Sequence, residues 1–169
     1  MNENTAYVKA ITLLDNARAK GLRLATAESC TGGLIAAALT EIPGASDVFD
    51  RGFVTYSNAA KCEMLGVSEE LIAAHGAVSA EVARAMALGA IDRSAADVAV
   101  AVTGIAGPGG GSAEKPVGLV HFACARRGGE VDQVERRYGP LSRAEIRAAS
   151  VLQALDVMIE ALAGVQRRP

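Results

Sequence analysis

Apolar residues recur every three or four positions in several segments, which is the spacing of one face of an α-helix. Small polar residues precede several of these segments, and glycine or proline follows most of them, as at helix starts and stops. The pattern predicts helices over residues 7–19, 29–44, 58–66, 79–95 and 142–164. Ser79 and Ser142 are the predicted N-caps of the last two, and Ser68 begins a further short turn.

Runs of apolar, β-branched and aromatic residues alternate with these helices. They predict strands over residues 22–28, 50–57, 96–104, 119–127 and 131–139. The run ADVAVAVTG at 96–104 is continuously apolar, which is typical of a strand covered on both faces. The last two strands are joined by a short glycine turn and predict a hairpin. This alternation favours an α/β layered domain with a partly parallel sheet and one antiparallel hairpin.

Composition narrows the class of protein further. The 169 residues suit one domain over 1–169, and half of them are hydrophobic although only 4% are aromatic. A net charge of −2 gives no general attraction to nucleic acid or to an anionic membrane. No apolar run has the length of a membrane span, and no signal peptide is apparent, so we expect a cytoplasmic protein. Cys30, Cys62 and Cys124 have neither disulfide nor zinc-site spacing.

Short polar residues at the end of the first predicted strand allow two interpretations. In the sequence TAESCTGG, Ser29 or Thr31 can simply cap the following helix. Alternatively, Ser29, Cys30 or Thr31 is a nucleophile, and N–H groups of the helix start stabilise the negative charge that develops in the reaction. Two glycines that follow would let a substrate approach the backbone closely. This local pattern leaves capping and catalysis, and the identity of the nucleophile, open.

A hydroxyl nucleophile needs a base, and few residues qualify. His75 lies at a predicted helix end and His121 lies within a predicted strand, where structural roles are the simpler interpretation. Lys61 follows Tyr56 by five positions in an otherwise uncharged stretch. A lysine can act as a base when burial or a neighbouring cation lowers its pKa, although an exposed helix lysine is the simpler alternative.

Two further features could hold an anion. The loop GIAGPGGGSAEKPVG after Thr103 matches neither a Walker A motif nor GxGxxG, but its amides could form an anion-binding nest. A mobile connection between strands is the plainer interpretation. Arg143 and Arg147 lie one helical turn apart and could together clamp a phosphate or carboxylate, or form structural ion pairs.

Several motifs together resemble one known family over most of the chain. The segments AESCTGGLIAAALTEIPGAS, GFVTYSNAAKCEMLGV, AVTGIAGPGGGSAEKPVGLV and RAEIRAASVLQAL are similar to the C-terminal domain of the competence/damage-inducible protein CinA. The resemblance implies a three-layer α/β/α fold and a cytoplasmic homodimer that needs no metal or other cofactor. It also implies hydrolysis of the carboxamide of nicotinamide mononucleotide to nicotinate mononucleotide and ammonia.

The resemblance also implies roles for individual residues. Ser29 falls on the family's nucleophile, Lys61 on its lysine base and Tyr56 on its tyrosine, which positions the lysine or relays its proton. The residues expected to bind substrate or form the oxyanion hole are Glu28, Cys30, Thr31, Gly32, Gly33, Thr103, Gly104, Gly107, Gly109, Gly110, Arg143 and Arg147.

Two other functions remain compatible with these residues. A non-catalytic nucleotide-binding or interaction module of the competence and DNA-damage response would keep the glycine loop and the arginines without an activated lysine. An amidase that acts on a different amide would keep the whole constellation. Binding to DNA itself would have to rest on a local patch such as Arg126, Arg127, Arg136 and Arg137, because the net charge is negative.

Overall fold

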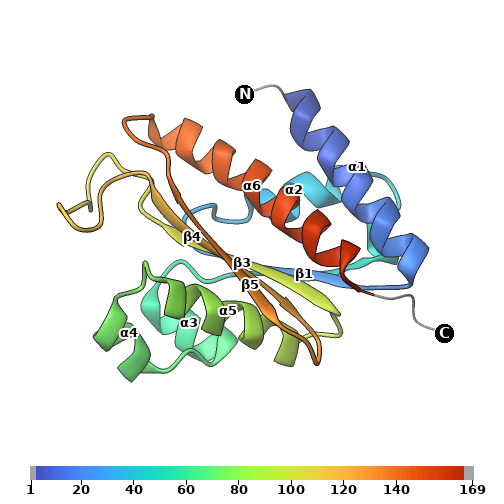
Figure 1. Ribbon diagram of the computed structural model, residues 1–169, viewed down its shortest axis with the longest axis horizontal. Helices are drawn as coiled ribbons and strands as arrows, with labels where there is room; N and C mark the ends of the chain where they lie inside the picture. The colour runs from blue at the N-terminus through green and yellow to red at the C-terminus, as the bar shows by residue number, and fades with distance from the viewer. Residues whose placement is uncertain (1–2, 166–169) are drawn as a thin grey trace.

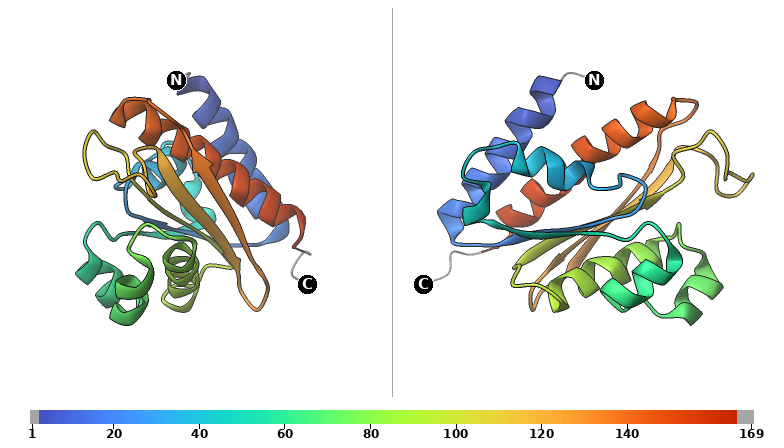
Figure 2. Two further views of the ribbon diagram at one scale, coloured as in Figure 1. Left: turned by 60° about the vertical axis from the view of Figure 1, so that its left-hand side comes forward. Right: turned by 180° about the vertical axis from the view of Figure 1, so that it is seen from behind.

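A computed structural model describes residues 3–165 and shows a five-stranded sheet between two layers of helices (Figures 1 and 2). The helices are α1 (Glu3–Lys20), α2 (Leu34–Thr40), α3 (Asn58–Leu65), α4 (Glu69–His75), α5 (Ala80–Asp92) and α6 (Arg143–Ala163), with a 3-10 turn at Ala45–Asp47. The strands are β1 (Leu24–Glu28), β2 (Phe49–Val54), β3 (Val98–Gly104), β4 (Leu119–Arg126) and β5 (Val131–Arg137). The predicted α/β/α class is therefore confirmed.

The sheet is mixed, with strand order β2-β1-β3-β4-β5. Strands β2, β1 and β3 are parallel, whereas β4 and β5 run antiparallel and form the predicted hairpin. The carboxyl ends of β1, β2 and β3 therefore meet at one edge of the sheet. Glu28 is in register with both Val54 and Val102, so the segments that follow these three strands leave the sheet side by side.

The two faces of the sheet carry side chains of different size. Valines of β3 and Phe122 of β4 face α1, α2 and α6, whereas alanines of β1, β3 and β4 face α3, α4 and α5 (Figure 1). Residues Val98–Val102 are fully buried, as predicted for a strand that is covered on both faces. Because the alanine side chains on the face toward α5 are short, α5 packs close to the sheet.

One predicted helix is wrong in its extent. The segment 29–44 contains only the short helix α2, preceded by a turn over residues 29–33. Gly32 and Gly33 have φ of +59° and +99°, values that a right-handed helix does not tolerate. Thr31 does not cap α2 either, because its hydroxyl is buried without a hydrogen-bond partner in the described part of the chain. By contrast, Ser79 and Ser142 cap α5 and α6 as predicted.

Candidate active site

The carboxyl edge of the parallel strands brings a serine and a buried lysine together. Nζ of Lys61, on α3, lies 3.0 Å from Oγ of Ser29, which immediately follows β1. The same Nζ donates a hydrogen bond of 2.8 Å to the carbonyl oxygen of Thr55, the residue after β2. Because β1 and β2 are parallel neighbours, their ends place both contacts within reach of one amine.

The environment of Lys61 disfavours its charged form. The residue is only 1% exposed, and no carboxylate among residues 3–165 forms an ion pair with it. Burial lowers the pKa of the Lys61 amine below its ordinary value of 10.5, because water no longer solvates the ammonium ion. A neutral lysine that donates to Thr55 keeps its lone pair free to accept the Ser29 hydroxyl proton.

Burial acts in the opposite direction on the neighbouring thiol. It raises the pKa of Cys30 to about 11, an effect that the residue's own backbone N–H only partly offsets. The thiolate, which is the reactive form of cysteine, is therefore disfavoured at neutral pH. Thr31 is fully buried, and among residues 3–165 Ser29 is the only hydroxyl that is hydrogen-bonded to Lys61. The position next to the lysine thus belongs to Ser29.

A cavity of about 220 Å³ opens beside this pair. Its walls come from the ends of β1 and β3, the start of α3, the connection between α4 and α5, and the start of α6. The lining residues are Ser29, Cys30, Tyr56, Asn58, Lys61, Ala77, Val78, Thr103, Gly104, Ala106 and Arg143. Four of these residues were not predicted from the sequence, namely Asn58, Ala77, Val78 and Ala106. Only Asn58 offered a signal, as the polar residue of the TYSN motif.

Arg143 and Tyr56 form part of the cavity rim. The guanidinium of Arg143 donates to the Tyr56 hydroxyl at 2.8 Å and to the Gly107 carbonyl oxygen at 2.9 Å. It therefore joins the exposed tyrosine to the glycine loop. No hydrogen bond within residues 3–165 links Tyr56 to Lys61, in contrast to the contact that the expected tyrosine role would need.

The glycine loop is fastened to the connection between α4 and α5. Thr103 is buried and donates through its hydroxyl to the carbonyl oxygen of Ala77 at 2.8 Å. Lys115 donates to the carbonyl oxygens of His75 and Val78. Gly104 lines the cavity, whereas Gly109 and Gly110 are exposed and do not. The loop side of the cavity is therefore Thr103, Gly104 and Ala106 rather than the whole glycine run, and Gly107 only accepts a hydrogen bond from Arg143.

Two expected site residues lie behind the turn over residues 29–33 instead of in the cavity. Glu28 is fully buried, and its carboxylate accepts hydrogen bonds from the N–H groups of Gly33, Ile35 and Ala36. It thereby caps α2, where a negative charge is favourable. Arg147 donates to the carbonyl oxygens of Cys30 and Thr31, each at 3.1 Å. Arg143 and Arg147 therefore do not clamp one anion together.

The two histidines do not line the cavity that contains Lys61. His121 lies in β4, where burial lowers its pKa below the ordinary value, and His75 ends α4. Their positions outside the cavity agree with their predicted structural roles. No cluster of three potential metal ligands occurs among residues 3–165. Within the same residues no helix is both long and apolar enough to cross a membrane.

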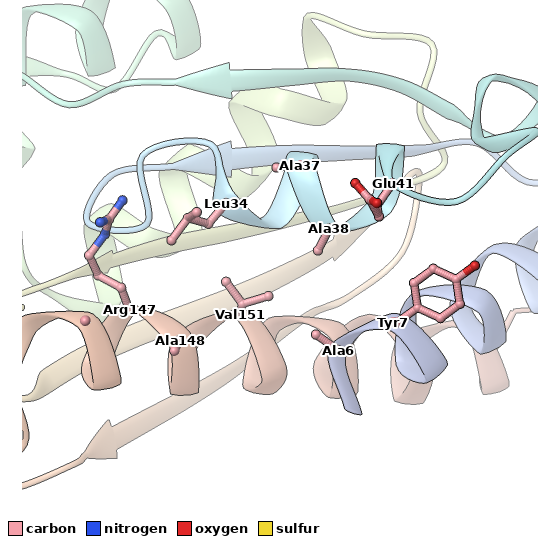
Figure 3. Close-up of a pocket in the computed structure, with 10 residues that line it drawn as sticks. Ala6, Tyr7, Leu34, Ala37, Ala38, Glu41, Arg147, Ala148 and Val151 are labelled. Carbon is pink, nitrogen blue, oxygen red and sulfur yellow. The ribbon is translucent and has the colours of Figure 1, made fainter. Parts of the chain in front are cut away.

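A larger apolar groove of about 740 Å³ lies between α1, α2 and α6 (Figure 3). Half of its lining residues are alanines, while Leu34, Val151, Tyr7 and Glu41 complete the walls, and Arg147 lies at one end. Neither Ser29 nor Lys61 lines it. Despite its size, the groove includes neither member of the Ser29–Lys61 pair, so the smaller cavity is the candidate active site.

Fold and site together define an α/β/α protein with a serine–lysine pair at the carboxyl edge of its parallel strands. The protein-family model of the CinA C-terminal domain matches residues 8–162 of the sequence. The chain therefore belongs to this family. A crystal structure of a competence/damage-inducible protein from Agrobacterium tumefaciens has 57% sequence identity and a TM-score of 0.92, covering 94% of this chain and 96% of that one.

Two curated relatives show the range of proteins that carry this domain. The chain is 53% identical over 138 residues to the nicotinamide-nucleotide amidohydrolase PncC of Enterobacter agglomerans, covering 82% of this chain and 84% of the relative. It is 56% identical over 140 residues to a CinA-like protein of Akkermansia muciniphila, covering 83% of this chain but 34% of the relative. The chain spans about a third or less of several such relatives.

Proposed function

We propose that this chain is a nicotinamide-nucleotide amidase, which converts nicotinamide mononucleotide to nicotinate mononucleotide and ammonia in pyridine-nucleotide salvage. The observation that carries the proposal is the 3.0 Å contact between Ser29 and the buried Lys61 at a cavity. An amine with a lowered pKa next to a hydroxyl is the arrangement that activates a serine nucleophile. The relative named as an amidohydrolase of this nucleotide supports the choice of substrate.

In the proposed mechanism Ser29 forms a covalent intermediate. Oγ attacks the carboxamide carbon while neutral Lys61 accepts the hydroxyl proton. The resulting oxyanion is stabilised by N–H groups of the turn after Ser29. The carbon–nitrogen bond then breaks, and the Lys61 ammonium returns the proton to the leaving nitrogen, which departs as ammonia. Water attacks the acyl-enzyme with Lys61 again as the base, and releases the carboxylate product and free Ser29.

The rest of the substrate would extend from the cavity to its rim. The cavity of about 220 Å³ is smaller than the roughly 300–1,000 Å³ of pockets that enclose a whole drug-sized ligand. It suits the pyridine carboxamide, with the ribose phosphate outside. Arg143 lies at the rim beside Gly107, where its guanidinium can bind the phosphate, and Asn58 adds an amide to the wall. Tyr56 would act by holding Arg143 rather than Lys61.

The deciding assay measures ammonia and nicotinate mononucleotide released from nicotinamide mononucleotide. We expect Ser29→Ala to lower kcat by at least about 1,000-fold, because nucleophile and base act as a unit. Cys62→Ala, one residue from Lys61, is the matched control and should retain activity. If Ser29→Ala kept wild-type kcat, the serine mechanism would be wrong.

The principal alternative is a non-catalytic nucleotide-binding module. Wild-type protein that binds the nucleotide but releases no ammonia would favour this alternative, and turnover of another amide in a substrate panel would instead change the substrate. The cytoplasmic homodimer implied by the family remains part of the proposal. Light scattering of the purified chain tests its oligomeric state.

A further inference from the structure

We infer that Arg147 is a positioning residue, which holds the backbone of the turn beside Ser29 in place instead of binding the substrate phosphate. The inference rests on the proposed serine mechanism. Figure 3 shows the Arg147 side chain extending from α6 toward the turn that precedes α2. There its Nε and Nη2 atoms donate to two consecutive carbonyl groups, those of Cys30 and Thr31.

The first three carbonyls of this turn, those of Ser29, Cys30 and Thr31, each accept a hydrogen bond from a specific donor. The Ser29 carbonyl accepts from the Gly32 N–H at 3.0 Å, and the Thr31 carbonyl accepts from the Leu34 N–H as well as from Arg147. The Cys30 carbonyl is different, because its acceptor position is filled by Arg147. A planar guanidinium that bonds two successive carbonyls restrains both their directions and their spacing.

Holding a carbonyl also determines the direction of an N–H group. In a planar trans peptide the C=O of one residue and the N–H of the next point in opposite directions. When Arg147 draws the Cys30 carbonyl toward α6, the Thr31 N–H points away from Arg147. That N–H has no hydrogen-bond acceptor among residues 3–165. Thr31 is fully buried and does not line the cavity, so the fixed direction of this peptide positions Ser29 and Cys30, which do line it.

Glu28 completes this arrangement from the other end of the turn. Its carboxylate takes up the N–H groups of Gly33, Ile35 and Ala36. The N–H donors at the start of α2 are thus already used, and Cys30 is the residue of the turn that lines the cavity beside Ser29. Arg147 is the only side chain among residues 3–165 that bonds the carbonyls of this turn, so it alone links α6 to the catalytic backbone.

The test compares kcat and KM for variants of the two arginines with nicotinamide mononucleotide. We expect Arg147→Met to lower kcat by about 100-fold, as small displacements of reacting groups can do, with KM within about twofold of wild type. Arg147→Lys keeps the positive charge but loses the planar guanidinium that donates to two carbonyls at once. This variant should recover part of kcat. Arg143→Met should instead raise KM, because it removes a group at the rim.

A structural control separates positioning from general loosening of α6. Lys9→Met removes the ion pair with Asp156 that ties α1 to α6, and should leave kcat unchanged after confirmation of folding by circular dichroism. If Arg147→Met raised KM and kept kcat, Arg147 would be a substrate-binding residue and the inference would be wrong. Unchanged kinetics in both Arg147 variants would also overturn it. If Arg147→Met does not fold, Arg147→Lys decides.

A second readout distinguishes failure of this inference from failure of the substrate assignment. The rate at which a fluorophosphonate labels Ser29 depends on the nucleophile and its donors but not on nicotinamide mononucleotide. We expect labelling of Arg147→Met to slow by a factor similar to that of kcat. Wild-type labelling without turnover would reject only the substrate, whereas equal labelling of wild type and Arg147→Met would reject the positioning role. Wild type that is neither labelled nor active would refute both proposals.

Discussion

Lys61 carries its amine into the interior of the protein, where the charged form loses its hydration and gains no carboxylate partner in the described chain. The resulting fall in its pKa suits the proposed role of Lys61 as a base but opposes folding at neutral pH, since the folded state favours deprotonation of a group that stays protonated in the unfolded chain. Functional sites commonly carry such a conflict between activity and stability.

A pH-dependent stability difference follows from this conflict. Between the lowered pKa of folded Lys61 and its ordinary value of 10.5, the unfolded chain binds the extra proton, so stability rises with pH. We expect Lys61→Met to abolish activity, lowering kcat by at least about 100-fold, and to raise the free energy of unfolding at neutral pH.

Urea unfolding of both proteins at several pH values checks the sign. The advantage of Lys61→Met should shrink as pH rises toward the ordinary lysine value, and Cys62→Ala serves as the control without this dependence. An advantage that did not vary with pH would mean that better packing, and not removal of a buried charge, is responsible.

At the scale of elements, close approach between helices determines which side chains fit. Gly89 lies in the middle of α5, where glycine lowers helix stability by about 1 kcal/mol relative to alanine. A Cβ at this position would lie only 2.0 Å from the carbonyl oxygen of Leu65 at the end of α3. The clash of this Cβ with the Leu65 backbone outweighs the higher helix propensity of alanine, because neither helix can shift without disturbing the alanine-lined face of the sheet.

We therefore expect Gly89→Ala to destabilise the protein by about 1–3 kcal/mol despite the better helix former. The measurement is the urea midpoint of the variant against wild type. Gly109→Ala is a matched control, because no atom lies within 4 Å of its added Cβ and its backbone is not left-handed. A raised midpoint for Gly89→Ala would show that α3 and α5 separate freely.

At the scale of the whole molecule, charge argues against DNA as a partner. The net charge is −2, and the four arginines of the hairpin form hydrogen bonds within the chain. Arg126 pairs with Asp132 and Arg137 with Glu135, while Arg127 bonds carbonyls at the end of α5 and Arg136 bonds Gln153. A patch already neutralised or bonded in this way attracts phosphates weakly.

We expect no saturable binding of duplex DNA near physiological salt, where the Debye length is about 8 Å. Fluorescence anisotropy with a labelled duplex measures this, and a salt titration separates counterion release from a specific complex. Tight binding that weakens on Arg137→Glu would contradict the expectation and favour the DNA-damage alternative.

Much of this protein was predictable from its sequence. Periodicity predicted the helices, the buried strand at 96–104 and the caps Ser79 and Ser142, because such features depend on neighbouring residues. The motifs at strand ends predicted the family and the region of the site. The predicted extent of the helix after Ser29 was wrong, because Gly32 and Gly33 take left-handed conformations and the carboxylate of Glu28, not Thr31, caps α2.

Only the tertiary structure decided what each polar residue does. Parallel pairing of β1 with β2 brings Ser29 and Thr55 to one amine, and packing then buries Lys61. Arg143 and Arg147 share a helix but bond different segments, the glycine loop and the turn after Ser29. The physical reason is that local sequence sets the conformation of a segment, whereas burial and hydrogen-bond partners arise from residues far apart in the chain.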